Sequence, residues 1–244
     1  MCTVSFVPHS SGYQLGMNRD EQRTRVRGIF PPAQRMGAVE IVGPTEPTGG
    51  RWVVCNSHGV TLALLNWYSR TVPSILNPYS RGDLTRSLAF ASDPGEVIRG
   101  LEKQPLDRVR PFRLVMVVNR SQSLFEWRWA GEHLEERRYP WADRIWASSG
   151  YDETAANVAR EQVFKSYLKR SPRSAANELF PFHQSHEPER GAFSVCMHRE
   201  EAATVSYTEV SVSDRSGCVR YIDGAPCQST LQSALELRFE VKCD

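Results

Sequence analysis

The sequence predicts an α+β fold in which two stacked, mostly antiparallel sheets carry helices on their outer faces. Three observations lead to this prediction. Several short β-rich segments are apolar along nearly their whole length, which is typical of strands covered on both faces. Turn residues join these segments in pairs, as in hairpins. Stretches with helical spacing of apolar residues, within 83–103 and 153–170, fall between or after the strand groups.

The first hairpin carries the main candidate for chemistry. Residues 3–7 and 13–17 have the β-rich composition of two strands, and the segment 8–12 between them is rich in turn residues. Cys2 lies just before the first strand and directly follows the initiator Met1. Because Met1 is normally removed when a small residue follows it, we expect the mature chain to begin with a cysteine that carries a thiol and a free α-amine.

An N-terminal cysteine can activate itself as a nucleophile. A free α-amine titrates near about 7.7–8.0 and a thiol near about 8.5, so the amine can accept the proton of its own thiol at neutral pH. The antiparallel return of the hairpin brings residues 18–20 beside Cys2. Arg19 and Asp20 are therefore candidates to hold the α-amine and to set the charge around the thiolate.

The remaining segments follow in order. Residues 22–48 contain several prolines and predict a loop-rich rim after the first hairpin. Strands are predicted at residues 51–55, 60–67, 112–118, 123–129, 133–138, 144–148, 191–199, 204–213 and 219–224. One helix is expected around 84–91, a second begins at Pro94, and residues 231–241 fit either a helix or a strand. The core-facing stripe of the long helix 153–170 is predicted at Ala155, Val158, Ala159, Gln162, Val163 and Tyr167.

Asn66 stands at the exit of a strand that should be buried. An amide in this place can point its NH₂ group at an oxyanion that develops during acyl transfer, which requires a donor within about 2.7–3.1 Å. The alternative interpretation is an asparagine that satisfies the turn at the end of the strand. The residues alone leave both interpretations open.

Composition excludes several classes of protein. The 244 residues carry a net charge of +2 with both signs mixed, and no basic stripe indicates a nucleic-acid partner. The chain shows no long apolar segment and no signal-peptide pattern, so we expect a cytoplasmic protein without a membrane span. Its six cysteines lack CxxC spacing and are expected to be free thiols, although Cys218 and Cys227 could pair in an oxidising compartment. With no repeat or linker, residues 1–244 are expected to form one domain.

A group of histidines and cysteines in the third quarter has two interpretations. His183 and His186 could supply half of a metal site, with Cys196 and His198 as the other ligands. Alternatively, they are ordinary histidines of a surface loop bounded by prolines. The second interpretation is the default, and the sequence therefore predicts neither a metal nor a cofactor.

The opening residues also resemble known families. The tetrapeptide Asn18-Arg19-Asp20-Glu21 resembles the Asn-Arg-Asp-Glu family, which includes the transport and Golgi organisation protein 2 group. The start Met-Cys-Thr and the run Gly16-Met17-Asn18-Arg19-Asp20 are similar to the N-terminal-cysteine hydrolases of the choloylglycine and penicillin V acylase type. That second family has Gly-Arg-Asn-x-Asp at this place, so its arginine corresponds to Met17 here.

The resemblance implies a fold and a set of roles. It implies the four-layer αββα sandwich of N-terminal-nucleophile hydrolases, with Asp20 at the position of the catalytic aspartate and Asn66 in the oxyanion hole. A second oxyanion donor, an asparagine in the acylase-type family, is replaced here by Ser148 within Ala147-Ser148-Ser149. Ser148 and Asn18 are thus the candidates for substrate binding or for the second donor.

Two classes of function follow. The leading hypothesis is a hydrolase that cleaves a non-peptide amide or related acyl bond in a small molecule, with Cys2 as nucleophile and its α-amine as base. The competing hypothesis is a binding or trafficking protein on the same scaffold that holds a hydrophobic ligand such as a lipid, an acyl-CoA or haem. A Soret band on addition of haemin would separate the two. The sequence gives neither the substrate nor the oligomeric state.

Overall fold

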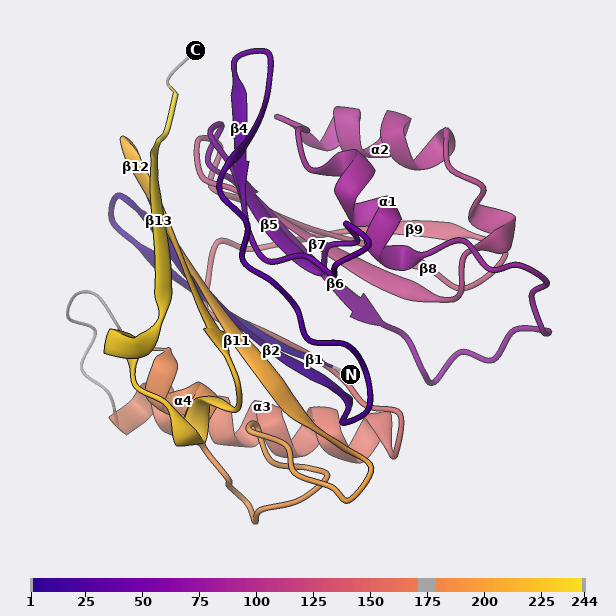
Figure 1. Cartoon of the computed structure of the whole chain (residues 1–244), viewed down its shortest axis with the longest axis vertical. Helices are drawn as coiled ribbons and strands as arrows, with labels where there is room; N and C mark the ends of the chain where they lie inside the picture. The colour runs from indigo at the N-terminus through magenta and orange to yellow at the C-terminus, as the bar shows by residue number, and fades with distance from the viewer. Residues whose placement is uncertain (1, 171–178, 243–244) are drawn as a thin grey trace.

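Two antiparallel sheets stack on each other and are covered by helices on both outer sides, as Figure 1 shows. The structure is a computed structural model and describes residues 2–170 and 179–242. In it, α1 and α2 lie on one outer side and α3 and α4 on the other. This arrangement confirms the predicted α+β fold with two stacked sheets and helices outside.

The first sheet has six strands in the order β10-β1-β2-β11-β12-β13. Every pairing in it is antiparallel, and β1 lies between β10 and β2. A β-bulge between Thr204 and Ser206 interrupts the pairing of β11 with β2. Its strands are β1 (Cys2–His9), β2 (Gly12–Gln22), β10 (Arg144–Ser148), β11 (Ala202–Ser213), β12 (Ser216–Asp223) and β13 (Leu235–Glu240).

The second sheet is a continuous meander of seven strands, from β3 to β9. Its central members β5, β6 and β7 are buried along almost their whole length, which agrees with their nearly unbroken apolar sequences. Its strands are β3 (Gln34–Met36), β4 (Val39–Val42), β5 (Val53–Asn56), β6 (Val60–Asn66), β7 (Phe112–Val118), β8 (Ser123–Trp129) and β9 (Leu134–Tyr139).

The helices begin where capping chemistry predicts. In α1 (Arg81–Leu88) the Ser80 hydroxyl accepts from the Asp83 amide, and in α2 (Pro94–Glu102) the Asp93 carboxylate accepts from the Glu96 amide. The other helices are α3 (Glu153–Arg170) and the short α4 (Phe180–Gln184). Short 3-10 turns lie at Leu106–Arg108 (η1), Pro226–Gln228 (η2) and Leu231–Ser233 (η3).

Four apolar clusters hold the layers of the described chain together, and the smallest packs Phe180 of α4 against Tyr207 and Ile222 of the six-stranded sheet. The largest joins the facing surfaces of the two sheets, with Phe6 and Leu15 from one and Cys55 and Val115 from the other. A second cluster joins α1 and α2 to the seven-stranded sheet. A third lies where Val163 and neighbouring residues of α3 pack towards α4 and β1. Each sheet therefore buries both of its faces, which accounts for strands that are apolar on both sides.

Three predictions differ from the structure, and the choice between helix and strand that residues 231–241 left open is answered. The segment 22–48 is not only loop, since β3 and β4 form a hairpin within it. Residues 191–199 do not form a strand, because the segment bends repeatedly and makes only an isolated bridge between His198 and Ala203. The buried residues of α3 are Glu153, Ala156, Arg160, Val163 and Phe164. Of the predicted stripe, Val163 is buried and Tyr167 packs, partly buried, against the same apolar cluster, whereas the other members do not belong to the buried face. Residues 231–241 contain a 3-10 turn followed by β13.

Candidate functional site

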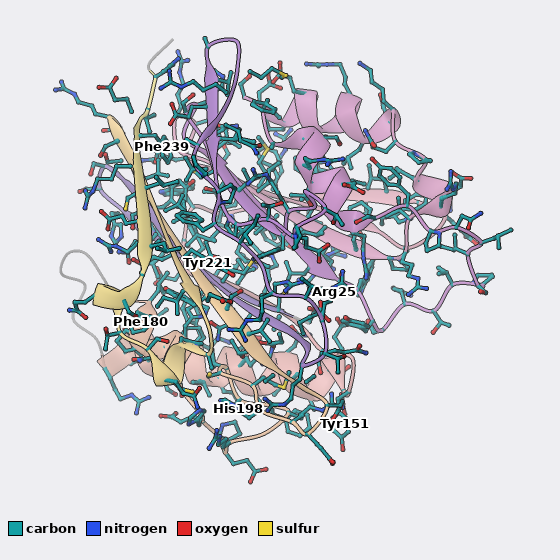
Figure 2. All side chains as sticks on the ribbon, viewed as in Figure 1. Arg25, Tyr151, Phe180, His198, Tyr221 and Phe239 are labelled. Carbon is teal, nitrogen blue, oxygen red and sulfur yellow. The ribbon has the colours of Figure 1, made fainter. Side chains whose placement is uncertain are left out.

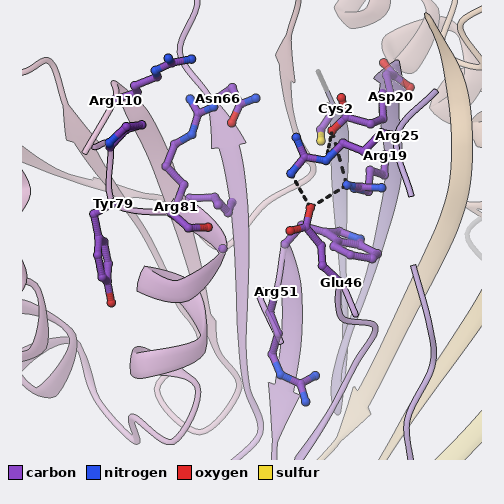
Figure 3. Close-up of a pocket in the computed structure, with 17 residues that line it drawn as sticks. Cys2, Arg19, Asp20, Arg25, Glu46, Arg51, Asn66, Tyr79, Arg81 and Arg110 are labelled. Atoms are coloured by element: carbon purple, nitrogen blue, oxygen red, sulfur yellow. Dashed lines mark hydrogen bonds and ion pairs between the residues drawn. The ribbon is translucent and has the colours of Figure 1, made fainter. Parts of the chain in front are cut away.

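A pocket of about 270 Å³ opens between the ends of the two sheets (Figure 3). Cys2 and Arg19 reach it from the first two strands, Asn66 from the end of β6, and Arg81 from the start of α1. The segment 46–52 before β5 supplies a further part of the wall. The hairpin that was predicted to bring residues 18–20 beside Cys2 does so, because Cys2 stands directly opposite Arg19 in the β1–β2 register.

Cys2 is held by its two neighbouring strands. Its backbone nitrogen donates to the Ser148 hydroxyl of β10 over 3.0 Å, and its sulfur accepts a hydrogen bond from the backbone amide of Asp20. The residue is buried. Burial raises the pKa of the Cys2 thiol and the carboxylate of Asp20 raises it further, while Arg19 opposes the rise. A base that takes the thiol proton is therefore needed before this sulfur can act as a nucleophile.

The Asp20 carboxylate is fixed from the helical side of the sheet. One of its oxygens accepts from the Thr204 hydroxyl over 2.6 Å, and the other lies 3.3 Å from the Arg160 guanidinium of α3. Both Asp20 and Arg160 are almost wholly buried. Arg160 also donates to the Thr3 hydroxyl and to the Ser194 carbonyl, so its charge is paired and its other donors are used.

Arg19 points the opposite way, into the space between the sheets. Its guanidinium lies 3.0 Å from the Glu46 carboxylate and 4.5 Å from the centre of the Trp52 ring. Arg25 contacts the same Glu46 carboxylate at 2.8 Å, as the dashed lines in Figure 3 show. Arg19 and Arg25 are thus largely neutralised by a carboxylate of the protein itself.

The other side of the pocket carries Asn66, Arg81 and Arg110 (Figure 3). Asn66 is half-buried at the end of β6, and its amide nitrogen donates to the Tyr68 hydroxyl over 2.7 Å, which leaves its second N–H available. Arg81 donates to the Pro111 carbonyl. Within the described part of the chain, no carboxylate lies within ion-pair distance of Arg81 or Arg110. Burial lowers the pKa of Arg81, and the neighbouring Arg110 acts in the same direction.

The candidate residues therefore fall into two groups. Cys2, Arg19, Asp20 and Asn66 all contribute to the wall of the pocket. Ser148 is fully buried and contacts the Cys2 nitrogen, so this geometry favours a role in positioning rather than the predicted role of second oxyanion donor.

Asn18 is the clearest correction. Its side chain donates to the carbonyls of His183 and Val195, on the helical side of the sheet and away from the pocket. It is fully buried there, so it links strand β2 to the helical layer and does not face a substrate. The reason is the alternation of side chains along a strand, which sends residues 18 and 20 to one face and residue 19 to the other.

Several residues that line the pocket or hold its residues in place were missed from the sequence. Arg160 lies on the buried face of α3, but a charged residue breaks the apolar periodicity by which such a face is recognised. Glu46 lies in the segment that was interpreted as a loop rim. Arg81 could have been identified from the sequence, because it directly follows the Ser80 cap of α1, and residues at the first turn of a helix commonly border a binding site.

Comparisons of the chain with known protein families and with curated proteins found no match. Comparison with solved structures found similar folds in hydrolases. A cysteine-to-alanine mutant of conjugated bile acid hydrolase from Clostridium perfringens matches with a TM-score of 0.59 and 11% identity, over 98% of this chain and 96% of that one. An arginine-to-leucine variant of the same hydrolase gives 0.57 and 10%, over 99% and 97%.

Penicillin V acylase from Agrobacterium tumefaciens also matches, with a TM-score of 0.54 and 12% identity over 91% of this chain and 86% of that one. At these identities the likeness shows the fold. The chain therefore has the four-layer αββα sandwich of the N-terminal-nucleophile hydrolases, as the sequence resemblance implied. Within the described residues, no helix is both long enough and apolar enough to cross a membrane.

Proposed function

We propose that the protein is an N-terminal-cysteine hydrolase that cleaves a non-peptide amide, or a related acyl bond, in a small molecule. The observation that carries the proposal is the place of Cys2: it lines the pocket together with Asn66, directly opposite Arg19 in the strand pairing and beside Asp20, whose carboxylate is fixed on the helical side of the sheet. The shared fold with conjugated bile acid hydrolase and penicillin V acylase supports the same assignment. The relation to the Asn-Arg-Asp-Glu family is part of the proposal.

The proposed reaction begins with removal of Met1, which turns the backbone nitrogen of Cys2 into an α-amine. The Ser148 hydroxyl, which contacts this nitrogen, orients the amine. The amine takes the thiol proton, the sulfur bonds to the substrate carbonyl carbon, and the carbonyl electron pair moves onto the oxygen. The second N–H of Asn66 stabilises that oxyanion, and Asp20 with Arg19 sets the charge around the amine and the sulfur.

The second half returns the enzyme to its starting state. As the oxyanion collapses, the C–N bond of the substrate breaks and the protonated α-amine donates its proton to the leaving nitrogen. This leaves a thioester on Cys2. Water then attacks the thioester carbonyl while the same amine accepts its proton, the C–S bond breaks, and the thiol recovers a proton from the amine.

The charge of the pocket suggests the chemical class of the substrate. Arg19 and Arg25 are paired with Glu46, whereas Arg81 and Arg110 have no carboxylate partner in the described part of the chain. Guanidinium groups bind carboxylates and phosphates well. We therefore propose an amide that carries a carboxylate or phosphate group. This charged, small pocket does not favour the alternative of an extended hydrophobic ligand such as a lipid or haem.

The first test is the intact mass of protein produced without an N-terminal tag. A mass lower by one methionine is expected, because only then is the amine of Cys2 free. The protein is next incubated with a panel of amides and thioesters, and the acyl adduct on the N-terminal peptide is sought by mass spectrometry. Cys2→Ala should lose turnover and adduct, while Cys55→Ala, a buried cysteine outside the pocket, serves as the control. Turnover retained in Cys2→Ala would refute the mechanism.

The second test addresses the substrate class. Loss of one charge-assisted hydrogen bond costs about 1.5–3 kcal/mol, so Arg81→Gln should raise KM for a carboxylate-bearing amide by about tenfold to a hundredfold. KM for a neutral amide of similar size should hardly change. Arg99→Gln is the matched control, because Arg99 is exposed on α2 and outside the pocket. Equal effects on charged and neutral amides would contradict an anion subsite.

A further inference from the structure

Two histidines and two cysteines converge on the helical side of the six-stranded sheet, in a cluster separate from the pocket. Their ligand atoms, on His186, Cys196, His198 and Cys227, all lie within 4.8 Å of one another. His186 follows α4, Cys196 and His198 lie in the bent segment 191–199, and Cys227 lies in η2. Figure 2 shows His198 among the loops beside α3 and α4.

Two distances within the cluster fit a tetrahedral zinc site. The Nε2 atom of His198 lies 3.5 Å from the Cys196 sulfur and 3.4 Å from the Cys227 sulfur. With Zn–S near about 2.3 Å and Zn–N near about 2.0–2.1 Å, a tetrahedron places sulfur and nitrogen about 3.6 Å apart. The observed separations are those of ligands around a shared ion.

An independent observation concerns His186. Its Nε2 atom is buried and has no hydrogen-bond partner in the described part of the chain. The rings of His186 and His198 lie with their centroids 5.1 Å apart and nearly perpendicular. A buried imidazole nitrogen without a partner costs free energy unless it binds something, and beside two thiols a metal ion is the natural partner.

The backbone already holds the four residues together. The Cys196 amide donates to the Ser185 carbonyl, next to His186. The Gln184 side chain donates to the carbonyls of Pro226 and Ser229, which lie on either side of Cys227. The ligands therefore come from three segments that the fold brings together. The sequence indicated His186, Cys196 and His198 as possible ligands, but it named His183 in place of Cys227, which lies far along the chain.

We propose that His186, Cys196, His198 and Cys227 form a structural zinc site. Two thiolates and two imidazoles in a tetrahedral set favour Zn²⁺, and four protein ligands leave no open position for a substrate, so the ion is structural rather than catalytic. On binding, the two thiols release their protons to solvent. This replaces the sequence-based interpretation of these histidines as members of a surface loop. The proposal is independent of the proposed hydrolase activity.

The site has a structural consequence for the neighbouring residues. The segment that supplies Cys196 and His198 also accepts hydrogen bonds from Arg160 at Ser194 and from Asn18 at Val195. At Met197 it bonds to Thr204, whose hydroxyl donates to Asp20. Zinc would hold this irregular segment in place, and with it the groups that fix the Asp20 carboxylate.

The test uses full-length protein without a polyhistidine tag, dialysed extensively against metal-free buffer. Elemental analysis should give about one zinc per chain. Replacement of zinc by Co²⁺ should give the intense visible bands of tetrahedral cobalt together with thiolate-to-cobalt charge-transfer absorption. Cys227→Ser and His186→Gln should lose stoichiometric zinc, whereas Cys218→Ser, a half-buried cysteine on β12, should keep it.

A second measurement keeps the proposal testable if a variant does not fold. Zinc should raise the melting temperature of the unmodified protein in a concentration-dependent way. The proposal is overturned if metal-free wild-type protein binds Co²⁺ without the charge-transfer band. It is also overturned if Cys196 and Cys227 are found joined in a disulfide in freshly purified protein that holds no metal.

Discussion

Removing the positive charge of Arg160 should be the most damaging single substitution near the site. The guanidinium and the Asp20 carboxylate are both fully buried, 3.3 Å apart, and Arg160 is also bonded to Thr3 and Ser194. Arg160→Met keeps a long side chain but leaves a carboxylate in the interior without its partner. Breaking a buried pair in this way costs about 3–5 kcal/mol, so we expect the free energy of unfolding to fall by that amount.

Urea denaturation followed by circular dichroism measures the loss. Lys165→Met is the matched control, because Lys165 forms an exposed pair with Glu161 on the same helix and such pairs contribute about 0.3–0.5 kcal/mol. The double variant Asp20→Asn with Arg160→Met should recover part of the stability, since no charge is then left buried. A loss below about 1 kcal/mol in Arg160→Met would refute the buried pair.

Three further predictions concern other residues. Burial and the charge of Arg160 lower the pKa of His183 to about 3, while an unfolded histidine titrates near about 6.5. The free energy of unfolding should therefore fall as pH drops below about 6.5, by about 3 kcal/mol at pH 4 for this group. Urea titrations should show a flatter pH dependence of this free energy in His183→Gln, and equal pH dependence in both proteins would contradict the buried neutral ring. Asn66→Ala should lower kcat for acyl transfer by about 10²–10³, measured against Tyr68→Phe, which keeps the amide; an unchanged kcat would remove Asn66 from the oxyanion hole. Val158→Lys should change the free energy of unfolding by less than about 0.5 kcal/mol, because that side chain is 52% exposed, whereas Phe164→Ala should lower it by about 3–5 kcal/mol. A larger loss in Val158→Lys than in Phe164→Ala, measured by urea denaturation, would support the stripe predicted from the sequence.

The fold could be predicted wherever local pattern and burial agree. The strands β5, β6 and β7 are apolar on both faces because both faces are covered, and their sequences show it directly. The bounds of α3 were predicted correctly, yet its buried face was not. Glu153 and Arg160 lie on that face, and a search for apolar periodicity assigns charged residues to solvent. The strand predicted at 191–199 is absent for a related reason, since the β-rich residues of this segment are buried by close packing rather than paired in a ladder.

The sequence predicts the part of the candidate site that lies within the first hairpin. Because Cys2 and residues 18–20 are joined by a tight turn, their proximity follows from register alone. Asn66 was found through its place at the end of a buried strand. Arg81, Glu46 and Arg160 come from segments far apart in sequence, and only the stacking of the layers brings them to the same end of the sheets. That the whole chain forms one domain stays a prediction.

Successive side chains of β2 point to opposite faces of the sheet, which explains why neighbouring residues of one short motif make different contacts. Arg19 faces the pocket with Cys2, while Asn18 and Asp20 face the helical layer and are held there by α3, α4 and the segment 194–204. The position of Asp20 therefore depends on groups that never touch the pocket. The irregular segment among them lacks a ladder of its own, and a bound ion is a physical means of keeping such a segment in one conformation. On this reasoning the proposed zinc site and the proposed nucleophile lie on opposite faces of the six-stranded sheet, and the first would act on the second only through Asp20.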